Sequence, residues 1–382
     1  MPTPTTSRTH VTRPNGYAQT ALVLQGGGAL GAYQAGVYQG LSEAGYEPDW
    51  LSGISIGAIN AAIIAGNEPV DRLSRLTEFW ELVTSAFPWP APISGGDARR
   101  MFNAMSAGAS MAGGQPGFFS PRLPSMFSWV NRAPGALSAY DTAPLRKTLE
   151  QLVDFDRINS GRTRLSLGAV NIRLGNFAYF DSSETRITAD HVMASGALPP
   201  GFPPICINGE HYWDGGLVSN TPLSQVLDAG PAQDTLVFQV DLFSARGELP
   251  RDLLELEMRR KQIVYSSRTR LNTDQFRERH ALRRAIAQLF DQLPPEAKQS
   301  EEMQRLRDLG ADHKVSIVHL IYRRRNYEGQ ALDYEFSKAS MEEHWRAGHE
   351  DAQRTLRHPL WLEPPSDLAG VRVCDIGQTD LN

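Results

Sequence analysis

Two strand–glycine turn–helix units near the start of the chain constrain its fold more than any other feature. Residues 21–24 form a short apolar run typical of a strand buried on both faces, and glycines separate it from a helical stretch over 29–44. Residues 50–52 predict a second strand, which a sharp turn over 53–57 joins to a compact apolar helix over 58–65. Strands that alternate with helices need right-handed crossovers, so the sequence predicts a mainly parallel sheet.

The rest of the chain continues this alternation and then changes character. Further helices are predicted over 145–152 and 189–195, paired strands over 165–172 and 177–180, and a buried strand over 236–240. Beyond about residue 250 the pattern predicts long charged helices over 252–293 and 295–309, a strand over 315–322 and a helix over 340–355. We therefore expect an α/β fold: a three-layer sandwich with a central, mostly parallel sheet, plus a mainly helical C-terminal extension that contributes at least one strand.

The segment 88–134 differs from its surroundings because it is dense in Gly, Pro, Ser, Met and Phe. Loops of this length are usually functional or disordered. Met and Phe suit a mobile cover over an apolar site, so the segment is either such a lid or a simple insertion.

Composition excludes several classes of protein. The chain has 382 residues, of which 41% are hydrophobic and 21% charged, as in soluble globular proteins. Its formal net charge of −5 provides no overall field that would recruit nucleic acid. No apolar stretch reaches the roughly 20 residues of a spanning helix, and the first sixteen residues lack the apolar core of a secretory signal. We expect a cytoplasmic protein with peripheral membrane contact at most and a disordered tail over residues 1–18.

The two cysteines, Cys206 and Cys374, lie far apart in the sequence. They could form a disulfide, but reduced thiols are the expectation for a cytosolic protein. Neither has the close spacing to His or another Cys that a zinc site needs, so we expect no metal.

The turn after the second predicted strand has the pattern Gly-x-Ser-x-Gly, with Ser55 between Gly53 and Gly57. In a nucleophile elbow the serine sits on a strained turn, and glycine provides the small flanking positions that this turn requires. The turn exposes the hydroxyl and aims a helix N-terminus at developing negative charge. The pattern also occurs by chance, but its strand–turn–helix setting favours the elbow.

The glycines after the first predicted strand allow two interpretations. Gly26, Gly28 and Gly31 fit the spacing of a dinucleotide-binding turn, which needs an acidic residue at the end of the second strand. Glu47 and Asp49 instead precede that strand, so this interpretation is weak. We favour an anion-binding nest of backbone N–H groups at a helix N-terminus, placed to receive an oxyanion.

A third element is Asp214 followed by Gly215 and Gly216. Taken alone, an aspartate before two glycines is more often a turn residue than a functional one. Together, the glycine loop, the serine turn and this segment, in this order and spacing, resemble those of patatin-like phospholipases. Residues 194–204 are similar to a segment that this family carries just before its aspartate. The resemblance covers about residues 20–240, and the C-terminal third is similar to an extra domain on some bacterial members.

The resemblance implies a Ser–Asp dyad in which Ser55 attacks an ester carbonyl and Asp214 is its base. The implied oxyanion hole consists of backbone N–H groups of Gly26, Gly27, Gly28 and Ile56. The motif glycines Gly31, Gly53, Gly57, Gly215 and Gly216 would support this geometry. One departure is Leu30, because many members carry Arg or Lys at this position of the loop; its absence weakens the case for tight binding of a phosphate headgroup.

Histidines and arginines offer further candidates. In a conventional α/β-hydrolase triad the histidine follows the acid, which would point to His313 or His319, although a histidine within an apolar strand is more often structural. The C-terminal third also carries a basic run: Arg259, Arg260, Lys261, Arg268, Arg270, Arg277, Arg279, Arg283 and Arg284. It could meet anionic lipid, but a solvated helix with paired charges is favoured. The polar stretch 265–269 could dock against the catalytic part.

Together these features predict a hydrolase of lipid carboxylic esters that needs no cofactor. Its catalytic domain would span 19–248, with a lid over 88–134 and a C-terminal domain over 249–382. The expected partner is a lipid or ester substrate, with peripheral contact to a membrane or lipid granule and none to nucleic acid. Two alternatives stay open: the same dyad acting on a polyhydroxyalkanoate storage polyester or short-chain esters, and a non-catalytic lipid-binding protein on the same fold.

Overall fold

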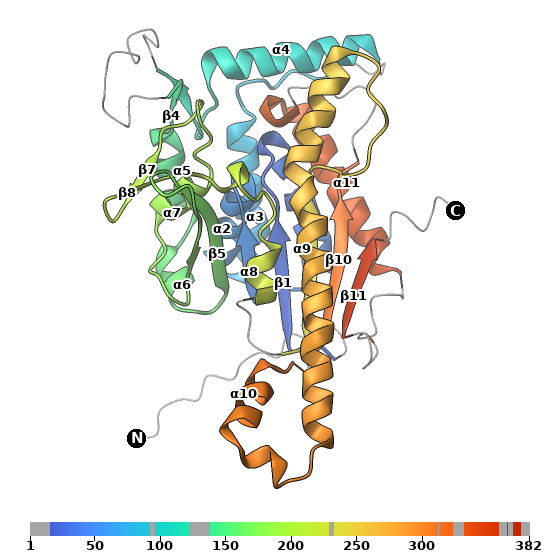
Figure 1. The fold of residues 1–382 in the computed structure, drawn as a ribbon. Helices are drawn as coiled ribbons and strands as arrows, with labels where there is room; N and C mark the ends of the chain where they lie inside the picture. The colour runs from blue at the N-terminus through green and yellow to red at the C-terminus, as the bar shows by residue number, and fades with distance from the viewer. Residues whose placement is uncertain are drawn as a thin grey trace.

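A computed structural model of the chain describes residues 16–91, 96–122, 138–228, 233–311, 313–323, 332–358, 365 and 370–375 (Figure 1). The side chains of Leu254 and of residues 267–270 lie outside this description. The main feature is one large sheet with helices on both faces, and a long helix that crosses the front and continues past the sheet.

The large sheet has nine strands in the order β11-β10-β9-β1-β2-β5-β8-β7, with β6 also paired to β5. Their bounds are β1 Gln19–Leu24, β2 Trp50–Gly53, β5 Arg164–Asn171, β6 Phe177–Asp181, β7 Ile205–Ile207, β8 Glu210–Asp214, β9 Thr235–Asp241, β10 Val315–Ile321 and β11 Val371–Asp375. All neighbours from β11 to β5 pair in parallel, whereas β6, β8 and β7 pair antiparallel. Two short strands, β3 Ser120–Pro121 and β4 Tyr140–Asp141, form a separate ribbon.

The helices cover both faces of the sheet. Their bounds are α1 Gly31–Glu43, α2 Ile56–Ala65, α3 Pro69–Val83, α4 Asp97–Gly113, α5 Ala143–Leu152, α6 Phe155–Asn159, α7 Ala189–Ser195, α8 Leu223–Asp228, α9 Leu253–Gln292, α10 Glu301–Leu309 and α11 Lys338–Leu356. Short 3₁₀ turns include η1 Gly28–Leu30, η4 Gly215–Leu217, η5 Ala297–Gln299 and η6 Leu332–Tyr334.

The side chains of β1 show that helices pack on both faces of the sheet, which makes three layers. Successive side chains of a strand point to opposite faces. Leu22 and Leu24 join the cluster that contains α1, α2, α3 and α11, whereas Ala21 and Val23 join a smaller cluster that contains α8 and Phe276 of α9. Because β1 is buried on both faces, the three-layer α/β prediction is confirmed.

The C-terminal third is joined closely to the rest of the fold. It supplies two strands of the large sheet, β10 and β11, and its helix α11 packs on α1. At this contact a Cβ on Gly36 would lie 1.9 Å from the carbonyl oxygen of Trp345, and one on Gly348 would lie 2.0 Å from that of Tyr33. The expected strand and helices of this region are present, with one strand more than the sequence predicted.

The structure differs from the sequence-based expectations in the segment 88–134 and at the N-terminal tail. The segment 88–134 is not a plain loop, because residues 97–113 form the helix α4; residues 92–95 and 123–137 lie outside the described structure. The predicted tail ends at residue 18, whereas Tyr17 is 5% exposed and its hydroxyl donates to Ser316 over 2.5 Å. Its ring packs with the core, so the described fold begins before residue 19, and residues 1–15 lie outside it.

Cys206 and Cys374 are both free thiols. Within the described ranges, no helix combines the length and the apolar character that crossing a membrane requires. The same residues contain no cluster of three or more His, Cys, Asp or Glu side chains arranged to hold a metal ion.

Candidate active site

Ser55 occupies a strained turn between β2 and α2. Its φ of 55° and ψ of −124° lie in a region that residues with a side chain rarely adopt. The flanking glycines are required by contact: a Cβ on Gly53 would lie 2.4 Å from the carbonyl oxygen of Gly57, and one on Gly57 would lie 2.3 Å from that of Leu24. The sequence pattern therefore corresponds to a turn that only glycine can flank.

The backbone of the turn is fixed by Ser195 at the end of α7. The amide of Ser55 lies 3.1 Å from both the hydroxyl and the carbonyl oxygen of Ser195. The hydroxyl of Ser195 in turn donates to the carbonyl of Gly168 on β5 over 2.7 Å. Three segments far apart in the sequence thus hold the serine in one orientation.

Asp214 ends β8 and faces the serine. Its side chain is 2% exposed, and the amide of Gly216 donates to its Oδ1 over 2.7 Å. Burial raises the pKa of Asp214 from 3.8 to about 7, while the hydrogen bonds from Gly216 and from the Ser55 hydroxyl oppose this rise. A carboxyl with this pKa can accept a proton near neutral pH, as a general base must.

The two glycines after Asp214 are needed where they stand. A Cβ on Gly215 would lie 2.6 Å from the carbonyl oxygen of Gly168. One on Gly216 would lie 2.8 Å from Oδ1 of Asn220 and 3.0 Å from Oδ1 of Asp214. The pair lets the chain turn tightly while its amide reaches the carboxylate.

The glycine loop contacts the serine directly. A Cβ on Gly26 would lie 3.0 Å from the Cβ of Ser55 and 2.4 Å from Oδ1 of Asn220. The side-chain amide of Asn220 donates to the carbonyl of Gly26 over 2.9 Å, and the amide of Gly26 donates to the carbonyl of Asn220 over 3.2 Å. The N–H of Gly26 therefore already has a partner, unlike its expected role as an oxyanion donor.

The other three amides expected to stabilise the oxyanion differ from that of Gly26, which already donates to a backbone carbonyl. The amides of Gly27, Gly28 and Ile56 donate to no backbone carbonyl among the described residues. Gly28 has a φ of 56°, and a Cβ on it would lie 2.2 Å from the carbonyl oxygen of Asp333. Gly31 allows close packing of α1 on α2, since its Cβ would lie 2.4 Å from Cγ1 of Ile56.

Sequence reasoning missed the polar residues that support this loop. Gln25 is fully buried, and its Oε1 accepts from the amides of Leu242 and Phe243 over 2.6 and 2.9 Å. Its Nε2 donates to the hydroxyl of Thr221 over 2.8 Å. The sequence offered one signal for this role, because Gln25 is a polar residue directly between an apolar strand and three glycines. Ser195 lies inside the segment 194–204, and Asn220 follows Gly216 by four residues, but the local sequence gives neither residue a role.

The structure argues against both alternative sites, the dinucleotide-binding turn and the conventional catalytic triad. Glu47 binds the buried guanidinium of Arg72 at 2.6 Å, and Asp49 accepts from the amide of Thr20 at 2.9 Å, so both acids have structural partners. His319 lies in β10, three strands from β2 in the sheet order, or about 14 Å at the usual strand spacing. Leu30 is fully buried, so this position of the glycine loop belongs to the core.

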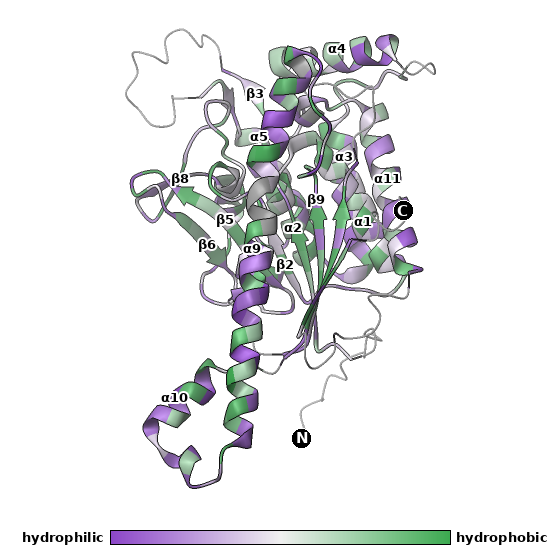
Figure 2. Cartoon of the chain, turned by 45° about the vertical axis from the view of Figure 1, so that its right-hand side comes forward, coloured by the Kyte–Doolittle hydropathy of each residue, from purple (hydrophilic) through white to green (hydrophobic). Residues whose placement is uncertain are grey.

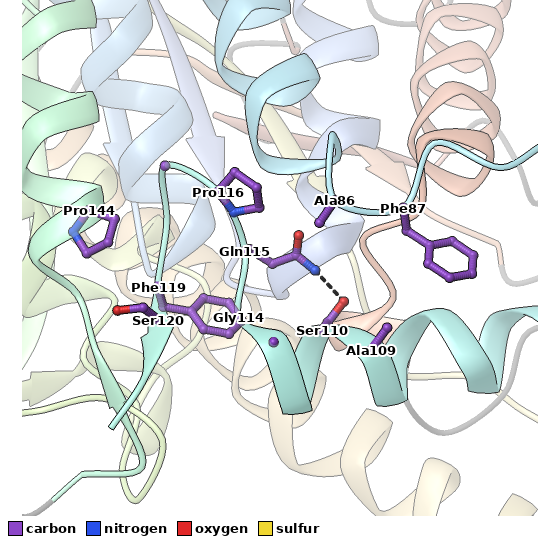
Figure 3. A pocket seen from close by; sticks show the side chains of 12 residues that line it. Ala86, Phe87, Ala109, Ser110, Gly114, Gln115, Pro116, Phe119, Ser120 and Pro144 are labelled. Carbon is purple, nitrogen blue, oxygen red and sulfur yellow. Dashed lines mark hydrogen bonds between the residues drawn. The ribbon is translucent and has the colours of Figure 1, made fainter. Parts of the chain in front are cut away.

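The helix α4, which belongs to the segment expected to cover the site, runs across the molecule at the carboxyl ends of the parallel strands (Figure 1). Between α4 and the chain that follows it is a cavity of about 430 Å³, with Ala109 and Ser110 on α4 and Gln115 and Phe119 beyond it (Figure 3). Phe119 also contacts Phe202, with ring centroids 5.3 Å apart. One wall of the cavity therefore belongs to an aromatic cluster, formed by Phe118, Phe119, Tyr140, Phe202 and Phe336.

Residues of the C-terminal third reach the site. The carbonyl of Tyr265 accepts from Nε2 of Gln25 over 3.2 Å, and the neighbouring Ser266 is buried, so these two residues dock as expected. Burial raises the pKa of Tyr265, and the nearby charge of Asp214 adds to this effect. Nζ of Lys261 lies 2.6 Å from Oδ1 of Asp333, whose carbonyl packs against Gly28.

The basic run of α9 is largely engaged within the molecule. Its described partners are the carbonyls of Ser244 and Ala245 for Arg259, Glu257 for Arg260, Asp228 for Arg279, the carbonyl of Leu309 for Arg283 and that of His313 for Arg284. The side chains of Arg268 and Arg270 lie outside the description. The run is therefore paired, as favoured, but mostly with other segments rather than along the helix, and Arg284 is buried rather than solvated.

Comparison with known proteins assigns the family. A sequence model of patatin-like phospholipases matches residues 22–227, more than half of the 382 residues, and a second, described as patatin phospholipase, matches residues 263–368. The chain belongs to the patatin-like phospholipase family. Membership of this family places it among the hydrolases of lipid esters. A search of curated proteins finds no match.

The solved structures that the comparison matches include proteins from bacteria and from human. VipD from Legionella pneumophila is 14% identical with a TM-score of 0.40, and the match covers 95% of this chain and 73% of that one. Human GIVD cytosolic phospholipase A2 is 10% identical with a TM-score of 0.39, covering 89% and 60%. ExoU, in its complex with SpcU from Pseudomonas aeruginosa, is 19% identical with a TM-score of 0.26, covering 68% and 52%.

Proposed function

We propose that the protein hydrolyses carboxylic esters of lipids through a Ser55–Asp214 dyad and an acyl-enzyme intermediate. The observation that carries the proposal is that the Ser55 hydroxyl interacts with a buried carboxyl, that of Asp214, whose pKa burial raises to about 7. An alcohol needs a base to become a nucleophile, and a carboxyl is effective in this role when its pKa lies near the working pH.

In the first half-reaction, Oγ of Ser55 attacks the ester carbonyl carbon while its proton passes to Asp214. The carbonyl oxygen becomes an oxyanion, for which the amides of Gly27, Gly28 and Ile56 are the proposed donors; Gly26 shapes the loop beside the serine. The intermediate then collapses to an acyl-serine, and the leaving alcohol takes the proton from Asp214.

In the second half-reaction, a water molecule gives a proton to Asp214 and attacks the acyl-serine. Collapse of this intermediate releases the fatty acid and returns the proton to Oγ of Ser55. No step needs a cofactor or a metal. We further propose that the apolar cavity beside α4 receives the acyl chain, with the catalytic part within residues 19–248 and α4 as part of its cover.

The test is a substrate panel of phospholipid vesicles, 4-nitrophenyl esters of increasing chain length and polyhydroxyalkanoate. It is run on the wild type, Ser55→Ala, Asp214→Asn and His319→Asn. Both dyad variants should lose at least about 10³-fold in turnover while remaining folded, and His319→Asn should stay active.

The outcomes separate the alternatives. A preference for long acyl chains supports a lipid substrate, and a preference for the polymer or short chains supports the storage polyester or simple esters. Activity that survives Asp214→Asn but is lost in His319→Asn would indicate a conventional triad. Binding of vesicles without turnover of any ester would instead support a non-catalytic lipid-binding protein.

A further inference from the structure

The outward face of α9 carries a straight row of exposed apolar side chains. Its members are Leu253, Val264, Leu271, Leu282 and Leu289, which are 80, 56, 55, 63 and 65% exposed. They are spaced by eleven, seven, eleven and seven residues. At about 100° per residue, eleven residues end 20° past three turns and seven end 20° short of two, so the five side chains share one line along the helix. We call this row the α9 stripe.

The α9 stripe points away from the body of the protein. Met258, Thr273 and His280 of the same helix are 4, 4 and 1% exposed. On the helical wheel these residues lie about 140–200° from Leu253. The helix therefore packs on the protein through one face and leaves an apolar row on the opposite face. Figure 2 shows apolar residues recurring along α9, including the part that continues past the sheet.

The spacing of the stripe is self-complementary. If two copies of α9 pair antiparallel about a two-fold axis between residues 267 and 268, Leu253 of one copy lies level with Leu282 of the other. Val264 then lies level with Leu271. The same two contacts recur on the other side of the axis, as an isologous interface requires.

Charges beside the stripe fit the same register. A two-fold axis of this kind keeps each flank of one helix beside the same flank of the other. Arg260, 66% exposed, then lies level with residue 275, between Asp274 and Glu278 of the other copy. The opposite charges meet twice in the pair, which favours this register over a shifted one.

A membrane is a weaker fit. Charged residues within about 40° of the stripe are Glu257, Arg260, Arg268 and Glu278, two acids and two bases. Helices that lie on membranes instead have flanks in which bases predominate. The overlap from residue 253 to 282 is about 44 Å long. A strip of this length and about 10 Å width on each helix buries on the order of 1,000 Å² in total, near the lower end for specific complexes.

We propose that the protein forms a homodimer through antiparallel pairing of the α9 stripe with that of a second copy. The small interface predicts a dimer that dissociates in the micromolar range. This inference does not depend on the proposed hydrolysis.

Sedimentation equilibrium of the full chain tests the association. Wild type should be dimeric at about 100 µM, and Leu271→Glu should be monomeric with an unchanged circular dichroism spectrum. The control is Leu174→Glu, because Leu174 is similarly exposed at 59% but lies in the β5–β6 turn. It should stay dimeric. A monomeric wild type at this concentration, or a dimer unaffected by Leu271→Glu, would overturn the proposal.

Cysteine cross-linking tests the orientation in a Cys206→Ser background. A mixture of Val264→Cys and Leu271→Cys proteins should form an interchain disulfide, whereas Val264→Cys alone should not, because seven residues separate the two sites by about 10 Å along the helices. Faster cross-linking of Val264→Cys with itself would indicate parallel pairing and overturn the register. Binding to vesicles of phosphatidylcholine and phosphatidylglycerol that Leu271→Glu abolishes, in a protein that is monomeric, would assign the stripe to a lipid surface instead.

Discussion

Replacing Asp214 with asparagine should remove turnover and, at the same time, make the folded protein more stable at high pH. Asparagine has nearly the same shape and keeps an oxygen for the amide of Gly216, which donates to Oδ1 over 2.7 Å. It cannot ionise, so the substitution removes the burial of a charge. Loss of function with a gain in stability is the signature of a residue kept for chemistry at a cost to folding.

The magnitude follows from the pKa. Burial raises the pKa of Asp214 from 3.8 to about 7, so the folded state binds its proton more tightly than the unfolded state. Its favourable contribution is therefore complete below about pH 4 and is lost as the pH rises through about 7. Between pH 5 and pH 8.5 this carboxyl should reduce the free energy of unfolding of the wild type by about 2–3 kcal/mol, a loss that the asparagine variant avoids.

Urea denaturation at several pH values, followed by fluorescence, measures this difference. Asp241→Asn is the matched control, because Asp241 is 5% exposed and burial raises its pKa to about 7, but it lies at the end of β9. Asp241→Asn should flatten the pH dependence of stability to a similar degree and keep its turnover. If the stability of Asp214→Asn followed that of the wild type across this pH range, the inference of a buried carboxyl with a raised pKa would be refuted.

Two further variants test the packing of the site. Gly57→Ala should lower the free energy of unfolding by at least about 2 kcal/mol and abolish turnover, because the new Cβ would lie 2.3 Å from the carbonyl oxygen of Leu24. The control Gly108→Ala in α4 should be neutral or stabilising by up to about 1 kcal/mol in urea denaturation, since nothing lies within 4 Å of its new Cβ. Equal losses of unfolding free energy in Gly57→Ala and Gly108→Ala would contradict the reasoning. Ala109→Trp should fill part of the 430 Å³ cavity and lower kcat/KM for long 4-nitrophenyl esters more than for short ones. Ala104→Trp is its control on the same helix, and an unchanged chain-length profile in Ala109→Trp would separate the cavity from the acyl site.

The parts of the site that could be predicted are those fixed by local geometry. Ser55 and its glycines form a turn that is defined within five residues, so strand, turn and helix signals were sufficient. The glycine loop follows the same logic at the end of β1. Asp214 was different, because its place beside Ser55 depends on the antiparallel pairing of β8 with β5, which joins segments about forty residues apart. Only the resemblance to a family identified it.

The elements that the sequence did not predict either bury polar side chains or depend on partners far away in the sequence. The inner face of α4 is mostly polar, so it gives little apolar periodicity to read in the sequence. Its buried residues are Arg99, Asn103, Ser106, Ala107 and Ser110. Arg99 is satisfied by Glu343 and Ser340 of α11, nearly 250 residues away. The supporting roles of Ser195 and Asn220 likewise arise from contacts between separate segments, which no local pattern encodes. For Gln25 the local sequence offered a signal, but its partners Leu242 and Phe243 lie more than 200 residues away.

The central claim is that the carboxyl of Asp214 activates the hydroxyl of Ser55. The most direct measurement is the rate of covalent labelling by a fluorophosphonate probe as a function of pH, with mass spectrometry to identify the modified residue. The account predicts a single label on Ser55, with a rate that rises with pH to half its maximum near pH 7 and that Asp214→Asn lowers throughout. A label on another residue, or labelling of Ser55 at an unchanged rate in Asp214→Asn, would contradict it.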